Sequence, residues 1–227
     1  MNENNISIII PAAGVGRRMK SYGPKPLIKV GNSTIIKNQI NLLRTYIDNS
    51  HIVLVCWFKA ERLMNETPDF ILKVENELYD QTNVVRSIGM GLRASANCLG
   101  VMIVYGDLVF NSEAIKHISF QKSSVVIAER GMGDEEVGCI IGEDNKLTHL
   151  MYDLAPKWGQ IAFFTGMELQ LLKNLCWDEK NNTKFGFEII NNIIDKGGSF
   201  NCIQNDKIQI IDIDSSKDIQ RAREILL

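Results

Sequence analysis

The sequence predicts a Rossmann-like, three-layer α/β sandwich whose central mixed sheet is mostly parallel and carries a small antiparallel extension. In the first half of the chain, short segments that are almost wholly apolar alternate with segments whose apolar residues have helical spacing. This alternation is typical of buried parallel strands connected by helices, with ligands beyond the carboxyl ends of the strands. In the second half, short strand-like segments are separated by charged turns, which indicates the antiparallel extension.

The first strand and the first helix have the clearest local signals. Residues 6–10 are isoleucine except for Ser7, and Pro11 ends the strand because proline cannot donate to a ladder. Ser33 or Thr34 is expected to cap a helix that ends near residue 46. Further elements of this half are expected as strands at 28–30, 51–56 and 100–105, helices at 59–63 and 84–96, and either type at 70–74.

The second half predicts shorter strands followed by helices. The double glycine at 197–198 is a plausible stop for a helix, and Ser215 or Ser216 is expected to cap the last one. The expected elements are strands at 123–128, 137–141, 147–152, 160–164, 200–204 and 208–211, and helices at 167–175, 185–196 and from the cap to residue 227.

Length and charge bound the class of protein. A chain of 227 residues can bury one sizeable core, and we expect a single domain over residues 1–227. The formal charge of −2, with no basic stripe outside the first loop, argues against a nucleic-acid surface. No apolar run approaches the length of a membrane span, and residues 1–5 are polar. The five cysteines are scattered without a C-x-x-C, so we expect reduced thiols in a cytoplasmic protein.

The loop after the first strand has the composition of a phosphate site. The side chains of residues 12–16 are too small to shield their backbone, whose N–H groups can therefore form an anion-binding nest. Four cations surround it, namely Arg17, Arg18, Lys20 and Lys25. The loop lacks G-x-x-x-x-G-K-[ST], and Met19 stands where a dinucleotide fingerprint needs a small residue, so a P-loop and a dehydrogenase are both excluded.

This stretch resembles the signature A-A-G-x-G-x-R-M followed by P-K-P-L of nucleotidyltransferases with the glycosyltransferase-A-like fold. That family includes sugar-phosphate uridylyl- and guanylyltransferases, methylerythritol-phosphate cytidylyltransferase and bacterial phosphocholine cytidylyltransferases. The resemblance implies that Arg18 and Lys25 are the catalytic cations. It also implies a nucleotide-binding role for Ala12, Ala13, Gly14 and Gly16.

Two aspartates follow apolar strands where metal ligands are expected. Asp107 follows the strand at 100–105, and Asp214 follows the strand at 208–211. Magnesium prefers oxygen ligands, and the resemblance to the family's late I-D-S/T-x-x-D stretch implies that these two aspartates hold Mg²⁺. Asp212 is two residues from Asp214 and is the rival for the second position, whereas Asp218 is expected to lie in the first turn of the last helix.

The segment before the helix at 84–96 resembles the family's base-contact stretch. Ser87 matches best and Asn83 next, although Thr82 or Asn83 could equally be ordinary helix caps. The acceptor pocket is expected in the variable middle of the chain, with Trp158 either in a cation-binding wall or, by preference, in the core or a lid. The candidates for that pocket are Glu136, Lys157, Trp158, Lys184 and Glu188.

The resemblance favours a CTP-dependent cytidylyltransferase that joins CMP to a small phosphorylated or phosphonate acceptor and releases pyrophosphate. The product would be a cell-surface or capsule precursor, of the phosphocholine or phosphonate kind. The acceptor oxygen is already anionic near neutral pH, so no general base is needed. A uridylyl- or guanylyltransferase acting on a sugar phosphate or molybdopterin, a retaining glycosyltransferase and a non-catalytic nucleotide-binding domain remain alternatives. The oligomeric state stays open, with a homodimer as one form.

Overall fold

The computed structural model describes residues 6–13, 23–47, 50–56, 60–95, 98–129, 131–133 and 135–225. Its centre is a mixed sheet with the strand order β10-β9-β11-β6-β1-β4-β5, in which β8 also pairs with β11 and β12 with β8. The parallel core consists of β1 (Ile6–Pro11), β4 (His51–Cys56), β5 (Leu72–Glu75) and β6 (Gly100–Val104). The ambiguous segment at 70–74 therefore contributes its last three residues to an edge strand, which begins at Leu72.

The strand-like segments of the second half join the same sheet. The longest strand, β11 (Lys157–Thr165), runs antiparallel to both β6 and β8. The others are β8 (Ser124–Ala128), β9 (Gly138–Ile141), β10 (Leu147–Met151) and β12 (Asn201–Ile203). The predicted mostly parallel mixed sheet with an antiparallel part is confirmed.

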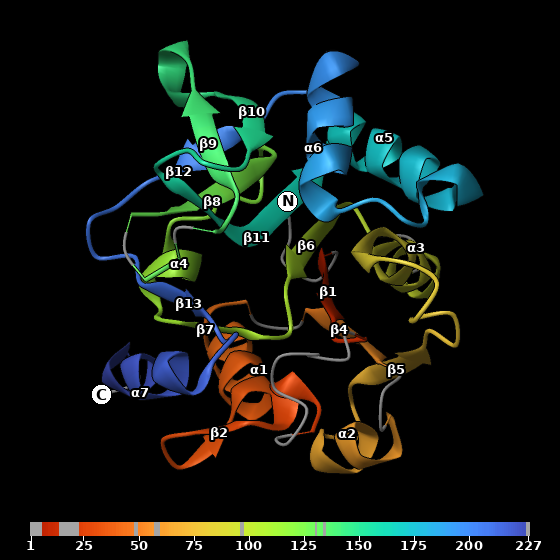
Figure 1. Cartoon of the computed structure of the whole chain (residues 1–227). Helices are drawn as coiled ribbons and strands as arrows, with labels where there is room; N and C mark the ends of the chain where they lie inside the picture. The colour runs from red at the N-terminus through yellow and green to blue at the C-terminus, as the bar shows by residue number, and fades with distance from the viewer. Residues whose placement is uncertain are drawn as a thin grey trace.

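Helices cover both faces of the sheet (Figure 1). One face packs against α1 (Ile35–Tyr46), α2 (Ala60–Glu66) and α4 (Glu113–Lys116), and the other against α3 (Val84–Ala94), α5 (Gly166–Trp177) and α6 (Gly186–Asp195). Strand β1 shows why its sequence is almost continuously apolar. Ile8 and Ile10 point into one core and Ile9 into the other, and all three are fully buried. Burying each of these side chains contributes about 1.5–3 kcal/mol.

Local signals set the ends of the main helices. Thr34 caps α1 by accepting a hydrogen bond from the Lys37 N–H at 3.4 Å, as one of the two predicted caps. Gly197, with φ of 90°, follows the last turn of α6 as expected. None of the helices in the described ranges is long and apolar enough to cross a membrane. All five cysteines are buried free thiols.

A small two-stranded sheet lies beside the main one, and its pairing was not predicted, although one of its strands overlaps the strand expected at 208–211. Strand β7 (Leu108–Phe110) pairs antiparallel with β13 (Ile210–Asp212), so that Leu108 lies opposite Asp212. The ribbon packs with α7 (Ser216–Ile225) and with the hairpin of β2 (Lys29–Val30) and β3 (Ser33–Thr34) over a separate apolar cluster. It carries the late aspartates to the carboxyl end of β6.

Candidate active site

Lys25 is the centre of a charged cluster at the carboxyl edge of the sheet. It opens the short 3₁₀ helix Lys25–Leu27, which Pro24 precedes. Its Nζ atom donates to Asp107 Oδ2 at 2.9 Å and to Asp214 Oδ1 at 2.6 Å, and lies 3.8 Å from Asp212 Oδ1. The structure thus brings together one predicted cation, both predicted metal ligands and the rival Asp212.

The backbone places Asp107 beside the first loop. The Gly106 N–H donates to the carbonyl oxygen of Pro11 at 3.1 Å, which ties the end of β6 to the end of β1. A Cβ atom at Gly106 would lie only 2.9 Å from the Cβ of Ala12 and 3.1 Å from that carbonyl oxygen. Glycine is therefore required for this close approach.

Asp218 holds the loop that carries Asp214. Its Oδ2 accepts hydrogen bonds from the N–H of Asp214 at 3.2 Å and of Ser215 at 2.8 Å, and from the Ser215 hydroxyl at 2.7 Å. The Ile213 N–H in turn donates to the carbonyl oxygen of Asp107 at 3.1 Å. The expected place of Asp218 in the first turn of the last helix is confirmed.

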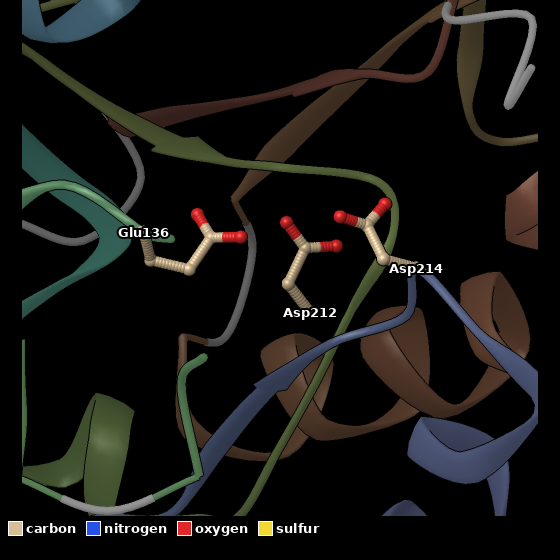
Figure 2. A group of neighbouring side chains, drawn as sticks. All are labelled: Glu136, Asp212 and Asp214. Carbon is tan, nitrogen blue, oxygen red and sulfur yellow. The ribbon is translucent and has the colours of Figure 1, made fainter. Parts of the chain in front are cut away.

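Glu136 joins the two late aspartates, although the sequence had suggested it only for the acceptor. Oxygens of Glu136, Asp212 and Asp214 lie within 4.8 Å of one another, with Asp212 between the other two (Figure 2). The Gln160 amide bridges Glu136 Oε2 at 2.9 Å and Asp212 Oδ2 at 3.1 Å. Gln160 has φ of 55° where β11 departs from regular pairing, and such an irregularity can re-aim a side chain.

The cluster carries an excess of negative charge in its described part. Burial opposes the charged form of Lys25, but Asp107 and Asp212 and the hydrogen bonds to Asp214 and Asp107 raise its pKa well above the ordinary value. Burial and the repulsion of Asp107 raise the pKa of Asp212, and burial and the repulsion of Asp214 raise that of Glu136. Asp212 Oδ1 is buried without a hydrogen-bond partner in the described residues. Because every atom that the acidic side chains of this cluster offer to a metal is a carboxylate oxygen, the cluster fits a magnesium ion.

A pocket of about 220 Å³ leads away from the cluster. Lys25 and Asp107 line one end, and Ala12 and Ala13 lie between it and the start of α3. The other end is lined by Thr82, Asn83 and Ser87, which belong to the predicted base-contact stretch. Asn76 and Tyr79 also line it and were not predicted. The expected capping role of Asn83 is confirmed, because its side chain accepts from the Val84 N–H at 2.8 Å at the start of α3. Asn83 also lines the pocket, and its contact with a base stays a prediction.

The acceptor candidates divide into two groups. Besides Glu136, only Lys157 reaches the cluster, because its Nζ atom donates to the Glu136 carbonyl oxygen at 2.9 Å. Trp158 is 4% exposed and packs edge-on against Tyr105 with ring centroids 5.8 Å apart, as the preferred core interpretation requires. Glu188 accepts from the Phe185 N–H at 2.7 Å and so caps α6. Lys184 lies partly exposed just before α6.

Three residues predicted for the nucleotide site, Gly14, Gly16 and Arg18, lie outside the described residues, as do Arg17 and Lys20. Their roles stay predictions.

Comparison with known proteins identifies the family. The model of the MobA-like NTP transferase domain matches residues 8–155. The bifunctional protein GlmU of Buchnera aphidicola subsp. Baizongia pistaciae is 25% identical over 156 residues, 66% of this chain and 34% of that protein. The 2-C-methyl-D-erythritol 4-phosphate cytidylyltransferase of Salmonella arizonae is 33% identical over 104 residues, 44% of this chain and 42% of that protein. These matches thus span less than half the length of either relative.

A solved structure has a similar fold over nearly the length of this chain. The CTP:phosphocholine cytidylyltransferase LicC of Streptococcus pneumoniae superimposes with a TM-score of 0.78 at 20% identity, covering 98% of this chain and 100% of that one. The predicted nucleotidyltransferase family and fold are both confirmed. The chain belongs to the family of MobA-like NTP transferase domains.

Proposed function

We propose that this protein is a cytidylyltransferase that joins CMP from CTP to a small phosphorylated or phosphonate acceptor and releases pyrophosphate. The observation that carries the proposal is the Lys25 cluster with Asp107 and Asp214, at one end of a pocket whose other end holds Ser87. Charge stabilisation at one end and polar groups for a base at the other are what nucleotidyl transfer requires. The likeness to cytidylyltransferases, in sequence and in fold, supports CTP as the donor.

In this reaction an acceptor oxygen forms a bond to the α-phosphorus of CTP, and the bond from that phosphorus to the bridging oxygen breaks. Negative charge grows on the α-phosphate and on the departing pyrophosphate. The Lys25 ammonium is a compact cation that can stabilise this charge, and Arg18 is predicted to assist it. The acceptor phosphate is already anionic, so the pocket needs to align it rather than remove a proton.

We further propose Asp107 and Asp214 as ligands of Mg²⁺, with Asp212 and Glu136 beside them as further oxygen donors. When bound, the ion would offset the charge of the nucleotide phosphates. We propose that Glu136 and Lys157 contact the acceptor on this side of the pocket, and that the product is a capsule or cell-surface precursor.

A matrix of CTP, UTP and GTP against phosphocholine, 2-aminoethylphosphonate, methylerythritol phosphate and glucose 1-phosphate, with magnesium and pyrophosphate detection, tests the proposal. We expect release with CTP and one acceptor. Release only with UTP or GTP would overturn the choice of nucleotide. Tight CTP binding without release from any acceptor would favour a non-catalytic domain.

A further inference from the structure

Asn76 is a buried amide at the base end of the pocket. It follows β5 directly, its N–H donates to the carbonyl oxygen of Cys56 at 2.9 Å, and only 2% of it is exposed. It nevertheless contributes to the pocket lining. A buried amide held in this way has a fixed position, so its donors and acceptor point in set directions.

The orientation of the Asn76 amide follows from the backbone. The Leu78 N–H lies 3.2 Å from Asn76 Oδ1, and because a backbone N–H can only donate, that atom must be the oxygen. The amide nitrogen then faces Ser87 Oγ at 3.1 Å and Thr82 Oγ1 at 3.5 Å. Thr82 gives its own proton to the Leu78 carbonyl oxygen at 2.6 Å, so its oxygen is available to accept.

The Asn76 amide therefore determines whether the Ser87 hydroxyl donates or accepts a hydrogen bond on its pocket side. Ser87 Oγ accepts from Asn76, which leaves the hydroxyl proton to be donated elsewhere. In the part of the chain that the structure describes, Ser87 makes no other side-chain hydrogen bond. Ser95, the C-cap residue of the same helix, differs because its hydroxyl donates to the Gly91 carbonyl oxygen at 2.8 Å. Ser87 is buried yet lines the pocket, so its proton is free for a ligand.

We propose that Asn76 is a positioning residue that makes Ser87 a hydrogen-bond donor toward the base and thereby selects cytosine. The ring nitrogen N3 of cytosine is an acceptor, whereas N3 of uracil and N1 of guanine carry a hydrogen. A site that offers only a donor at this point satisfies cytosine and leaves the other two bases unpaired. The inference rests on the proposed function, which supplies CTP as the nucleotide.

The test compares the dissociation constants of CTP and UTP by titration calorimetry with magnesium and no acceptor. In Asn76→Asp a carboxylate oxygen would accept a hydrogen bond from the Ser87 hydroxyl. The hydroxyl would then offer only the lone pairs of its oxygen to the base. We expect the preference for CTP over UTP to fall about tenfold. In a Ser87→Ala background the same change should have no effect on the preference for CTP, because the hydroxyl through which residue 76 acts on the base is absent. Ser95→Ala, which removes a buried hydroxyl at the far end of α3, is the control and should keep the wild-type preference.

Asn76→Ala covers the case in which Asn76→Asp does not fold, since a freely rotating Ser87 hydroxyl should also lose the preference in part. An unchanged preference in a folded Asn76 variant would overturn the inference while leaving the proposed function intact. An equal effect with and without Ser87 would overturn it too, because Asn76 would then contact the base itself. A wild-type protein that does not prefer CTP would overturn both.

Discussion

The two ends of the pocket are built in opposite ways. At the base end, Asn76, Thr82, Asn83 and Ser87 come from one short stretch and interact by hydrogen bonds between neutral groups. At the phosphate end, the partners of Lys25 lie 82 and 189 residues further along the chain and interact through charge. A local neutral network can change its specificity at small cost, whereas a charged cluster drawn from distant segments cannot lose one member without affecting the others. We therefore expect large effects on turnover at one end and smaller effects on affinity at the other.

Lys25→Ala should have the largest effect. Turnover is expected to fall about 10³-fold, because one fixed cation no longer stabilises the charge that grows during transfer. Lys25→Arg should not restore it, since a planar fork does not replace a compact ammonium among three carboxylates. Pyrophosphate release measures the effect, circular dichroism checks the fold, and Lys29→Ala, at an exposed lysine of β2, is the matched control. Near-normal turnover in folded Lys25→Ala would remove Lys25 from the mechanism.

Asp107→Ala should lower turnover about 10²-fold or more, because the site loses an oxygen ligand and a partner of Lys25. Raising the magnesium concentration should recover part of the lost rate if the aspartate holds the ion. Asp206→Ala changes an exposed aspartate and should leave the rate as it is. A folded Asp107→Ala protein with wild-type turnover would contradict the role of this residue.

Lys25→Met should strengthen metal binding in the absence of nucleotide. The Lys25 ammonium lies within 3 Å of two proposed metal ligands, so it competes with a cation for the same oxygens. We expect the dissociation constant for Mn²⁺, followed by electron paramagnetic resonance, to fall about tenfold. Lys29→Met is the control. Equal or weaker Mn²⁺ binding by the Lys25 variant would mean that the ion and the lysine occupy separate places.

Asn83→Ala should have the smallest effect and probes the base end. Loss of the α3 cap costs about 1 kcal/mol and lowers Tm by about 2–4 °C. The KM for CTP should rise about threefold, with a smaller change in kcat, because the helix start that lines the pocket loosens. Asn205→Ala removes another side chain that accepts from a backbone N–H, that of Lys207 at 2.9 Å, in a turn that does not line the pocket, and should lower Tm without a change in KM. A loss of turnover comparable to that of Lys25→Ala would erase the contrast between the two ends.

The sequence was sufficient wherever the signal was local. The isoleucines of β1, the Thr34 cap and the carboxyl-end positions of Asp107 and Asp214 all follow from periodicity and from residue type at strand ends. The resemblance to the family added the predicted role of Lys25 as a catalytic cation.

The sequence was insufficient where the signal was long-range. A strand was expected at 208–211, where β13 lies, but the three residues of β7 are too few for periodicity to show, and its pairing with β13 joins segments about a hundred residues apart. Asn76 and Gln160 are single amides without a motif, and their importance follows only from the groups that surround them. The core position of Trp158 was preferred from the sequence, but its edge-on packing against Tyr105 depends on the fold.

The antiparallel pairing of β7 with β13 also determines what an incompletely synthesised chain would lack. Residues 212–214 contribute two of the three carboxylates around Lys25, so a polypeptide interrupted before residue 210 would keep only Asp107 of those three beside the lysine. We therefore expect a chain that ends before residue 210, through ribosomal stalling or proteolysis, to have no activity rather than reduced activity.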